Sequence, residues 1–339
     1  MEQEVRLTKG MLLDENGELI EKGYNEDLIR TYDKKDVNVK GLRLKEWDYY
    51  YIGNNKHGVA LTVADNSYMW LASVTVLDFE KKTYHTFSKM GIPFKKLNLP
   101  NSSKMGDLVF TRKGFSFKFL HENGHRRLLV DVNKFQGSKF SLDVVLKENP
   151  NTSIVIATPF DKPKHFYYNH KINLMTVEGS FRIGTSIYPL DNAYGTLDWG
   201  RGVWTYKNTW YWSSASGTQN GKPIGFNLGY GFGDTKNASE NMFYYDSINY
   251  KFQDIEFVIP KDSGKDKFMM PWVLKSKTED IYLDFSPVVD RNSNSNVLVI
   301  KSIQHQVFGY FNGYFILPSG TKVEVNNLFG FAEKVVNNW

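Results

Sequence analysis

The stretch that decides the fold is residues 47–79, which read WDYYYIGNNKHGVALTVADNSYMWLASVTVLDF. Apolar and polar side chains alternate along most of it, with interruptions at Asn54-Asn55 and at Asp65-Asn66-Ser67. A period of two with short polar interruptions is typical of β-strands joined by tight turns. The stretch therefore predicts three consecutive antiparallel strands, the last two joined as a hairpin.

The same rhythm continues along the rest of the chain. In FSFKFL (115–120), for example, Phe115, Phe117 and Phe119 are expected to face one way, and Ser116 and Lys118 the other. No 10–15-residue helical pattern separates the short segments, which favours antiparallel sheets or barrels over βαβ units. The aromatic content of 15% also suits strands.

The rhythm starts again near Gly179, with a similar number of short segments on each side. We therefore predict an all-β protein with two antiparallel β-barrels in tandem and little helix. The N-terminal domain is expected over residues 1–178, including an irregular segment at its start, and the C-terminal domain over residues 179–339. Within the irregular segment, Asn25 is placed to cap a short helix through Tyr32.

Composition excludes several classes of function. The formal charge is 42 − 37 = +5 and the basic residues are scattered, so nucleic acid is not an expected partner. The chain has no cysteine, which excludes disulfides and thiolate chemistry and suits a reducing compartment. The N-terminal residues contain no apolar signal region, and no run approaches the length of a membrane span. A cytoplasmic location is therefore expected.

No motif indicates a metal or a cofactor. The His, Asp and Glu spacings match no zinc site. The glycine run at 229–233 is not followed by a helical pattern, so it is no dinucleotide fingerprint. Alternate glycines in a strand instead indicate the close approach of another group.

A candidate ligand pocket lies between Tyr194 and Asn241, where polar groups stand among aromatic and small residues. Four of the 8 tryptophans fall between positions 199 and 212. We predict a pocket in the second barrel or at the junction of the two. Its walls are expected to be Trp199, Trp210, Trp212 and Phe226.

Asp198 is the first candidate for a catalytic group. Its neighbours Leu197 and Trp199 predict partial burial, which would raise the pKa of the carboxyl and allow it to donate a proton. The alternative is an ion pair with Arg201, three residues further on across a glycine. Arg201 in turn is expected either to pack on a tryptophan in a cation–π contact or to bind a ligand anion.

Further candidates lie later in the chain. Glu240 and His305 are candidate catalytic groups, and Asn241 and Gln306 are candidate ligand-binding groups. The structural alternative is a turn cap for Glu240 and Asn241, and a hydrogen-bonded core residue for His305. Glu333 carries the same two interpretations.

Several long motifs resemble an uncharacterised, mainly bacterial family, domain of unknown function 2804. They stand in the family's order over nearly the whole chain: GLRLKEWDYYYI (41–52), YGTLDWGRGVW (194–204), WYWSSASG (210–217), GFNLGYGFGD (225–234), SEN (239–241), HQVFGYFNG (305–313) and GFAE (330–333). The family itself implies no activity.

A more distant resemblance does imply an activity. LDWGRG followed by Trp210-x-Trp212 is similar to a pattern of the carotenoid hydratase (hydroxyneurosporene synthase) and of AttH-like proteins. That resemblance implies two lipocalin-like barrels and a long apolar ligand. It carries over only Asp198, Trp210 and Trp212, because Trp199-Gly200 stands where the hydratase pattern has Arg-Glu.

Two functions follow as hypotheses. The first is an enzyme that binds an apolar or amphipathic small molecule, such as an isoprenoid, lipid or polyene, and transforms it by acid-assisted hydration, isomerisation or cyclisation. The second is a non-catalytic carrier of a lipid or isoprenoid. They differ in whether a carboxyl group faces the cavity, since a carrier needs only apolar walls and one polar anchor. Neither requires a cofactor, and the sequence leaves the oligomeric state open.

Overall fold

The alternating segments of the sequence form β-strands. The structure is a computed structural model and describes residues 4–92, 97–122, 124–297 and 300–338. This part of the chain contains no α-helix and one short 3₁₀ turn, η1 (Lys34–Asp36). It has no helix long and apolar enough to cross a membrane. The prediction of an all-β protein is confirmed.

The first compact unit spans Arg6–Trp204. Its strands are β1 (Gly10–Met11), β2 (Gly23–Asn25), β3 (Arg30–Thr31), β4 (Leu44–Gly53), β5 (His57–Asp65), β6 (Trp70–Asp78), β7 (Thr83–Gly91), β8 (Leu108–Arg112), β9 (Phe115–Glu122), β10 (His125–Phe135), β11 (Ser138–Lys147), β12 (Ser153–Pro159), β13 (Phe166–Ile183), β14 (Ser186–Pro189) and β15 (Tyr194–Val203). Among the described residues, all but β1 and β3 belong to one antiparallel sheet, and these two form a small parallel pair.

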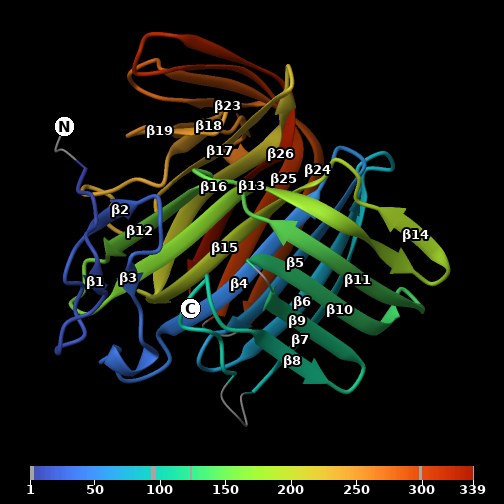
Figure 1. The fold of residues 1–339 in the computed structure, drawn as a ribbon, viewed down its shortest axis with the longest axis horizontal. Helices are drawn as coiled ribbons and strands as arrows, with labels where there is room; N and C mark the ends of the chain where they lie inside the picture. Colours follow the sequence, from blue (N-terminus) through green and yellow to red (C-terminus); the bar gives the residue numbers. More distant parts are fainter. Residues whose placement is uncertain (1–3, 93–96, 123, 298–299, 339) are drawn as a thin grey trace. The chain divides into compact units, whose positions relative to one another are not determined.

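The order of the strands in this sheet brings distant segments of the chain together. Its main path is β7-β6-β5-β4-β15-β13-β11-β10-β9-β8. The last strand of the unit, β15, lies between β4 and β13 and pairs with both (Figure 1). Side chains from residues 44–53, 166–183 and 194–203 therefore share one surface.

One face of the sheet carries the hydrophobic core of the unit. In β9, Phe115, Phe117 and Phe119 are buried, whereas Lys118 is exposed, as the alternation predicted. Leu61, Val130 and Leu197 belong to the same core cluster. We call this surface the inner face.

The second unit begins at Thr205 and also includes Glu4 and Val5. Its strands are β16 (Lys207–Gln219), β17 (Lys222–Tyr230), β18 (Met242–Tyr245), β19 (Ile248–Lys251), β20 (Glu256–Val258), β21 (Lys261–Asp262), β22 (Lys265–Asp266), β23 (Trp272–Lys275), β24 (Ile281–Val297), β25 (Ile300–Ile316) and β26 (Lys322–Asn338). Among the described residues, β21 and β22 form a separate hairpin, and the other strands form one antiparallel sheet with the order β19-β18-β17-β16-β26-β25-β24-β23-β20. Its core includes Phe226, Trp272 and Phe311.

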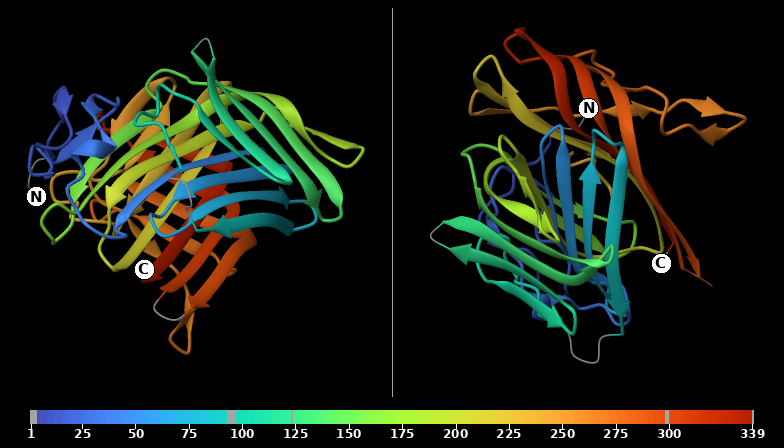
Figure 2. Two further views of the ribbon diagram at one scale, coloured as in Figure 1. Left: turned by 90° about the horizontal axis from the view of Figure 1, so that it is seen from below. Right: turned by 90° about the vertical axis from the view of Figure 1, so that its right-hand side faces the viewer.

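Each of the two large sheets is strongly curled into a half-barrel (Figure 2). A sheet that curls in this way can bury one face around its own apolar side chains. The arrangement is consistent with tandem lipocalin-like barrels. The predicted fold class is therefore confirmed.

The division between the units lies further along the chain than the sequence indicated. The expected boundary between residues 178 and 179 falls inside β13, and contacts divide the chain after Trp204. Gly179 does not mark a linker. It has φ +126°, and a Cβ there would lie 2.2 Å from the carbonyl oxygen of Asp143 on β11. The position therefore requires glycine because two strands approach closely.

The expected helix from Asn25 is wrong. The Asn25 side chain does accept a hydrogen bond from the backbone N–H of Asp27, at 3.0 Å. The chain then makes a turn and enters β3 at Arg30, so the contact is an Asx turn. The same local bond caps a helix or closes a turn, and here pairing of β1 with β3 decides between them.

Candidate functional site

Three polar side chains of β4 point to the inner face of the first unit. Antiparallel pairing sets Glu46 opposite Arg201, Asp48 opposite Trp199 and Tyr50 opposite Leu197. Residues directly opposite each other in such a pair share a face of the sheet. Because Tyr50, Leu197 and Trp199 belong to the hydrophobic core cluster, Glu46 and Asp48 enter it as well.

Arg201 is fully buried and its guanidinium is surrounded by acceptors. Nη2 donates to Asp48 Oδ1 at 2.9 Å and to the Pro100 carbonyl at 2.8 Å. Nη1 donates to the carbonyl of Trp47 at 2.8 Å, and Nε lies 3.7 Å from Glu46 Oε1. The group also lies over the Trp199 ring, 4.3 Å from its centroid. The cation–π contact predicted for Arg201 is therefore confirmed. Such a contact stabilises a protein by about 0.5–2 kcal/mol.

The expected ion pair between Asp198 and Arg201 is wrong. Both residues lie within β15, a regular strand rather than a turn, so side chains three positions apart point to opposite faces. Asp198 instead lies 3.5 Å from Lys171 Nζ and accepts a hydrogen bond from Asn169 Nδ2 at 2.5 Å. The carboxyl predicted to be catalytic thus points away from the inner face, and its catalytic role stays a prediction.

Asp48 has the electrostatic setting that the sequence led us to expect of Asp198. Burial raises the pKa of the Asp48 carboxyl above its ordinary value, and the nearby charges of Arg201 and Arg126 oppose the rise only in part. A buried carboxyl of this kind can stay protonated and act as a donor. Its neighbour Tyr50 has its pKa raised to about 12, again by burial.

Arg126 links Tyr50 to the rest of the inner face. Its Nη1 lies 3.4 Å from the Tyr50 hydroxyl and 2.9 Å from His121 Nε2. Its Nε donates to Glu148 Oε1 at 2.8 Å. Arg126 is therefore a buried cation whose charge is partly balanced by Glu148.

His170 of β13 completes the arrangement. It pairs with Trp199 in the ladder and so shares its face, and it is 1% exposed. Its Nδ1 lies 2.7 Å from Ser103 Oγ. Burial, reinforced by Arg126, lowers the pKa of His170 well below its ordinary value, so the ring is neutral at physiological pH.

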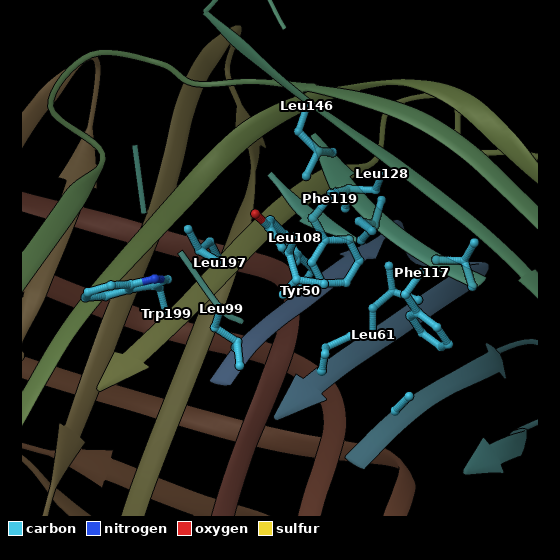
Figure 3. Packing of buried hydrophobic residues seen from close by; sticks show 14 of the residues in the cluster. Tyr50, Leu61, Leu99, Leu108, Phe117, Phe119, Leu128, Leu146, Leu197 and Trp199 are labelled. Carbon is cyan, nitrogen blue, oxygen red and sulfur yellow. The ribbon is translucent and has the colours of Figure 1, made fainter. Parts of the chain in front are cut away.

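We call five buried side chains of the inner face the inner polar cluster: Asp48, Tyr50, Arg126, His170 and Arg201. Figure 3 shows the apolar setting of the cluster, with Tyr50 and Trp199 among Leu99, Leu197 and Phe119. Within the part of the chain that the structure describes, no group of three or more His, Asp or Glu side chains is arranged to hold a metal ion. The cluster can donate protons and hydrogen bonds in apolar surroundings.

The candidates of the second unit form two hydrogen-bonded groups. In the first, Trp210 Nε1 donates to Glu333 Oε1 at 2.9 Å, and Gln306 Nε2 donates to Glu333 Oε2 at 3.1 Å. Arg291 Nη1 donates to Gln306 Oε1 at 2.8 Å. This series of hydrogen bonds crosses β24, β25, β26 and β16 and links these neighbouring strands.

The second group fixes the loop before β18. Trp212 Nε1 donates to Asn227 Oδ1 at 2.7 Å, and Asn227 Nδ2 donates to the Glu240 carbonyl at 2.7 Å. The backbone N–H of Gly229 donates to Asn241 Oδ1 at 2.8 Å. A Cβ at Gly229 would lie 2.5 Å from Glu240 Oε1, so the close approach indicated by the glycine run is confirmed. Glu240 and Asn241 hold the loop on β17, as their structural interpretation proposed.

Phe226 and His305 point to the other face of this sheet. Phe226 is fully buried in the core of the second unit, 5.0 Å from the Phe311 ring. His305 Nδ1 lies 2.7 Å from Asp290 Oδ2, and its ring stacks on Phe268 at 3.7 Å.

The predicted four-walled pocket is therefore wrong as a single site. Phe226 points away from Trp210 and Trp212 because they lie on opposite faces of one sheet, as the register of β16 and β17 requires. The ligand-binding roles proposed for these residues stay predictions.

A family model described as a domain of unknown function, DUF2804, matches residues 2–339. The chain belongs to this family. No protein of curated function matches the sequence significantly.

Two solved structures are similar to that of the DUF2804 chain. A proposed AttH from Nitrosomonas europaea has a TM-score of 0.52 and 12% identity, with 92% of this chain and 98% of that chain covered. Kievitone hydratase from Nectria haematococca has a TM-score of 0.49 and 12% identity, with 91% of this chain and 96% of that chain covered. At this identity, the likeness to the first of these structures shows the fold alone.

Apart from Arg201, sequence reasoning missed the inner polar cluster of this DUF2804 protein, although one signal was present. In KEWDYYYI (45–52), strict alternation sets Glu46 and Asp48 on the same side as Tyr50 and Ile52, so charged groups occupy inward positions. Polar residues at core positions need partners or a function. The partners of Asp48 come from strands more than 100 residues away, which no local pattern could show.

Proposed function

We propose that the first unit binds an apolar or amphipathic small molecule on its inner face and transforms it by an acid-assisted reaction, with Asp48 as the proton donor. The observation that carries the proposal is the buried Asp48 carboxyl, whose pKa is raised within an aromatic and aliphatic core. General acids with a raised pKa are tuned in this way by burial.

Arg201 makes the transfer of a proton from Asp48 favourable. The O–H bond of the Asp48 carboxyl breaks, the proton forms a new bond to the substrate oxygen as negative charge develops there, and the electron pair stays on the carboxylate. The guanidinium that donates to Asp48 Oδ1 at 2.9 Å stabilises this new negative charge. The proton returns to Asp48 when water adds to the substrate or when a neighbouring carbon loses its proton.

The charges around the site favour some reactions over others. Arg126 and Arg201 are both buried cations of the cluster, at 2% and 0% exposure. Two such groups oppose a carbocation on the substrate and stabilise negative charge on a substrate oxygen. Hydration or isomerisation through an oxygen anion therefore fits the site better than a cationic cyclisation.

A non-catalytic carrier is the second candidate. It is favoured by the direct contact between Asp48 and Arg201, which satisfies the carboxyl without any ligand. In that case the inner face supplies apolar walls and one polar anchor.

Compounds retained through gentle purification, identified by mass spectrometry, would provide the substrate for a direct test. The retained compound is incubated in D₂O with wild type, Asp48→Asn and Asp198→Asn. We expect solvent deuterium to enter the compound with wild type and Asp198→Asn, and not with Asp48→Asn. Loss with Asp198→Asn alone would assign the acid to Asp198, and binding without deuterium uptake in any of the three would assign the protein as a carrier.

A further inference from the structure

The indole N–H of Trp199 has no hydrogen-bond partner among the described residues. Trp199 is 0% exposed, and Nε1 is a buried atom without an acceptor. The ring is held by Arg201 over its face and by the edges of Tyr32 and Tyr168. Figure 3 shows the nitrogen end of the ring on the side toward Leu197 and Leu99. A buried donor without a partner is costly and needs an explanation.

A second unpartnered polar atom lies in the same row of the sheet. His170 is the ladder partner of Trp199, and its Nε2 is buried without a partner in the described part of the chain. Asp48 pairs with Trp199 from the other side, so the three side chains come from adjacent strands on one face. Adjacent strands lie about 4.8 Å apart, so Trp199 has His170 on one side and Asp48 on the other on the inner face.

Most of these groups are donors. An indole nitrogen can only donate. The Tyr50 hydroxyl oxygen accepts from Arg126, which leaves its own proton for another acceptor. When Ser103 donates to His170 Nδ1, Nε2 carries the ring proton and donates too. A group that satisfies Trp199 Nε1 must therefore be a hydrogen-bond acceptor.

We propose that the ligand of the first unit is an apolar ketone or aldehyde whose carbonyl oxygen accepts hydrogen bonds from Trp199 Nε1 and the Tyr50 hydroxyl, beside His170 Nε2. The inference rests on the proposed function, since it names the class of ligand for the same inner face. A carbonyl fits better than an alcohol because it accepts only, whereas an alcohol brings a further donor that needs its own acceptor. The positive charges of Arg126 and Arg201 also favour an oxygen that carries partial negative charge.

Three probes with one carbon skeleton test this class in the full-length protein: 2-undecanone, 2-undecanol and undecane. Dissociation constants are measured by competition with a fluorescent fatty-acid probe. The decisive quantity is the ratio of the undecane constant to the 2-undecanone constant, compared between wild type and variants, since transfer of the probes from water then cancels. We expect Trp199→Phe and Tyr50→Phe each to lower this ratio by roughly 3- to 10-fold, the usual effect of one hydrogen bond.

Tyr168→Phe serves as the matched control. Tyr168 is a buried tyrosine of the same core, but its hydroxyl donates to the Arg30 carbonyl at 2.8 Å. Its removal is expected to leave the ratio unchanged. The infrared band of ¹³C-labelled 2-undecanone should also shift to lower frequency on binding to wild type, and shift less in Tyr50→Phe, which keeps the ring contact with Phe119 and is expected to fold.

The outcomes separate the two proposals. If the three probes bind and the ratio is the same in wild type, Trp199→Phe and Tyr50→Phe, the carbonyl inference is overturned and binding on the inner face still stands. If 2-undecanol binds more tightly than 2-undecanone and the variants abolish that preference, the ligand is an alcohol and the inference is wrong. If none of the probes binds to wild type, both proposals are overturned.

Discussion

At the scale of single residues, two carboxyls on the neighbouring strands β4 and β15 have different surroundings because side chains alternate between the faces of a sheet. Asp48 points to the inner face, where burial raises its pKa despite Arg201. Asp198 points to the opposite face, where Lys171 is its cation. Burial is the largest influence on the pKa of Asp48, and it favours the protonated form of that carboxyl.

Asp48→Asn should change how stability depends on pH. The folded-state pKa of Asp48 lies above its ordinary value of 3.8, so between these two values the folded protein binds more protons than the unfolded chain. Its favourable contribution is therefore full below about pH 3.8 and is lost as pH rises toward the folded-state pKa. Asp48→Asn has no titrating group at this position, so its free energy of unfolding does not decrease in this way as pH rises.

We expect the free energy of unfolding of Asp48→Asn, minus that of wild type, to increase as pH rises from 4 to 8. Urea denaturation across this range measures the difference, in which the other titrating groups cancel. A difference that stays flat or decreases would show that the carboxyl is ionised in the folded protein.

Asp198→Asn should destabilise the first unit because Lys171 would lose its carboxylate. The Asp198 side chain is 12% exposed and that of Lys171 4%, so the variant removes a carboxylate that lies 3.5 Å from an almost buried ammonium group. The expected loss is at most about 3–5 kcal/mol. The double variant Asp198→Asn/Lys171→Met should recover much of it, since no charge remains buried. Thermal denaturation at pH 7 tests both, and a single variant as stable as wild type would contradict the expectation.

At the scale of elements, β15 is the strand on which the first unit depends. It pairs with β4 and β13 along its length, and it carries Trp199 and Arg201 on the inner face. On its outer face, Gly200 lies opposite Trp47, whose ring stacks on Tyr167. A Cβ at Gly200 would lie 2.0 Å from an atom of the Trp47 ring. Glycine at this position lets the indole lie flat against the strand.

Gly200→Ala should therefore destabilise the protein by about 1–3 kcal/mol through overpacking. Gly195→Ala, in the same strand, is the matched control, because its Cβ would come no closer than 3.1 Å to the flexible end of Leu146 and 3.4 Å to Met175 Cβ. Its expected effect is within about 1 kcal/mol. Chemical denaturation of the two variants provides the comparison. Equal effects would show that Trp47 moves aside without cost.

At the scale of the whole molecule, the chain has two cores with no residue in common. Leu61 belongs to the first cluster and Phe226 to the second, and both are fully buried. Core truncation costs about 2–5 kcal/mol for leucine and about 3–5 kcal/mol for phenylalanine. The loss of stability should affect mainly the unit whose core is truncated.

Hydrogen exchange followed by mass spectrometry can locate these losses. We expect Leu61→Ala to increase exchange most in β4, β5 and β6, and Phe226→Ala to increase it most in β16, β17 and β25. β4, β5 and β6 pair around Leu61, and β16 and β17 pair around Phe226. β25 carries Phe311, whose ring lies 5.0 Å from that of Phe226. An equal increase over both units in each variant would show that they open together.

The sequence by itself determined the β-strands and much of the face that each side chain occupies. Alternation is a local property, so FSFKFL (115–120) predicted its buried and exposed positions correctly. The cation–π contact of Arg201 with Trp199 was also within reach, because residues two apart in a strand share a face. The expected Asp198–Arg201 pair failed for the same reason, since residues three apart do not.

Only the tertiary structure decided which strands are neighbours, and with them the site. Asp48, His170 and Trp199 meet because β15 lies between β4 and β13, which is a matter of strand order rather than of local pattern. Strand order depends on the burial of the whole sheet, to which residues far apart in the chain contribute together. For that reason the sequence showed a carboxyl at an inward position, while its pKa and its partners followed only from the folded sheet.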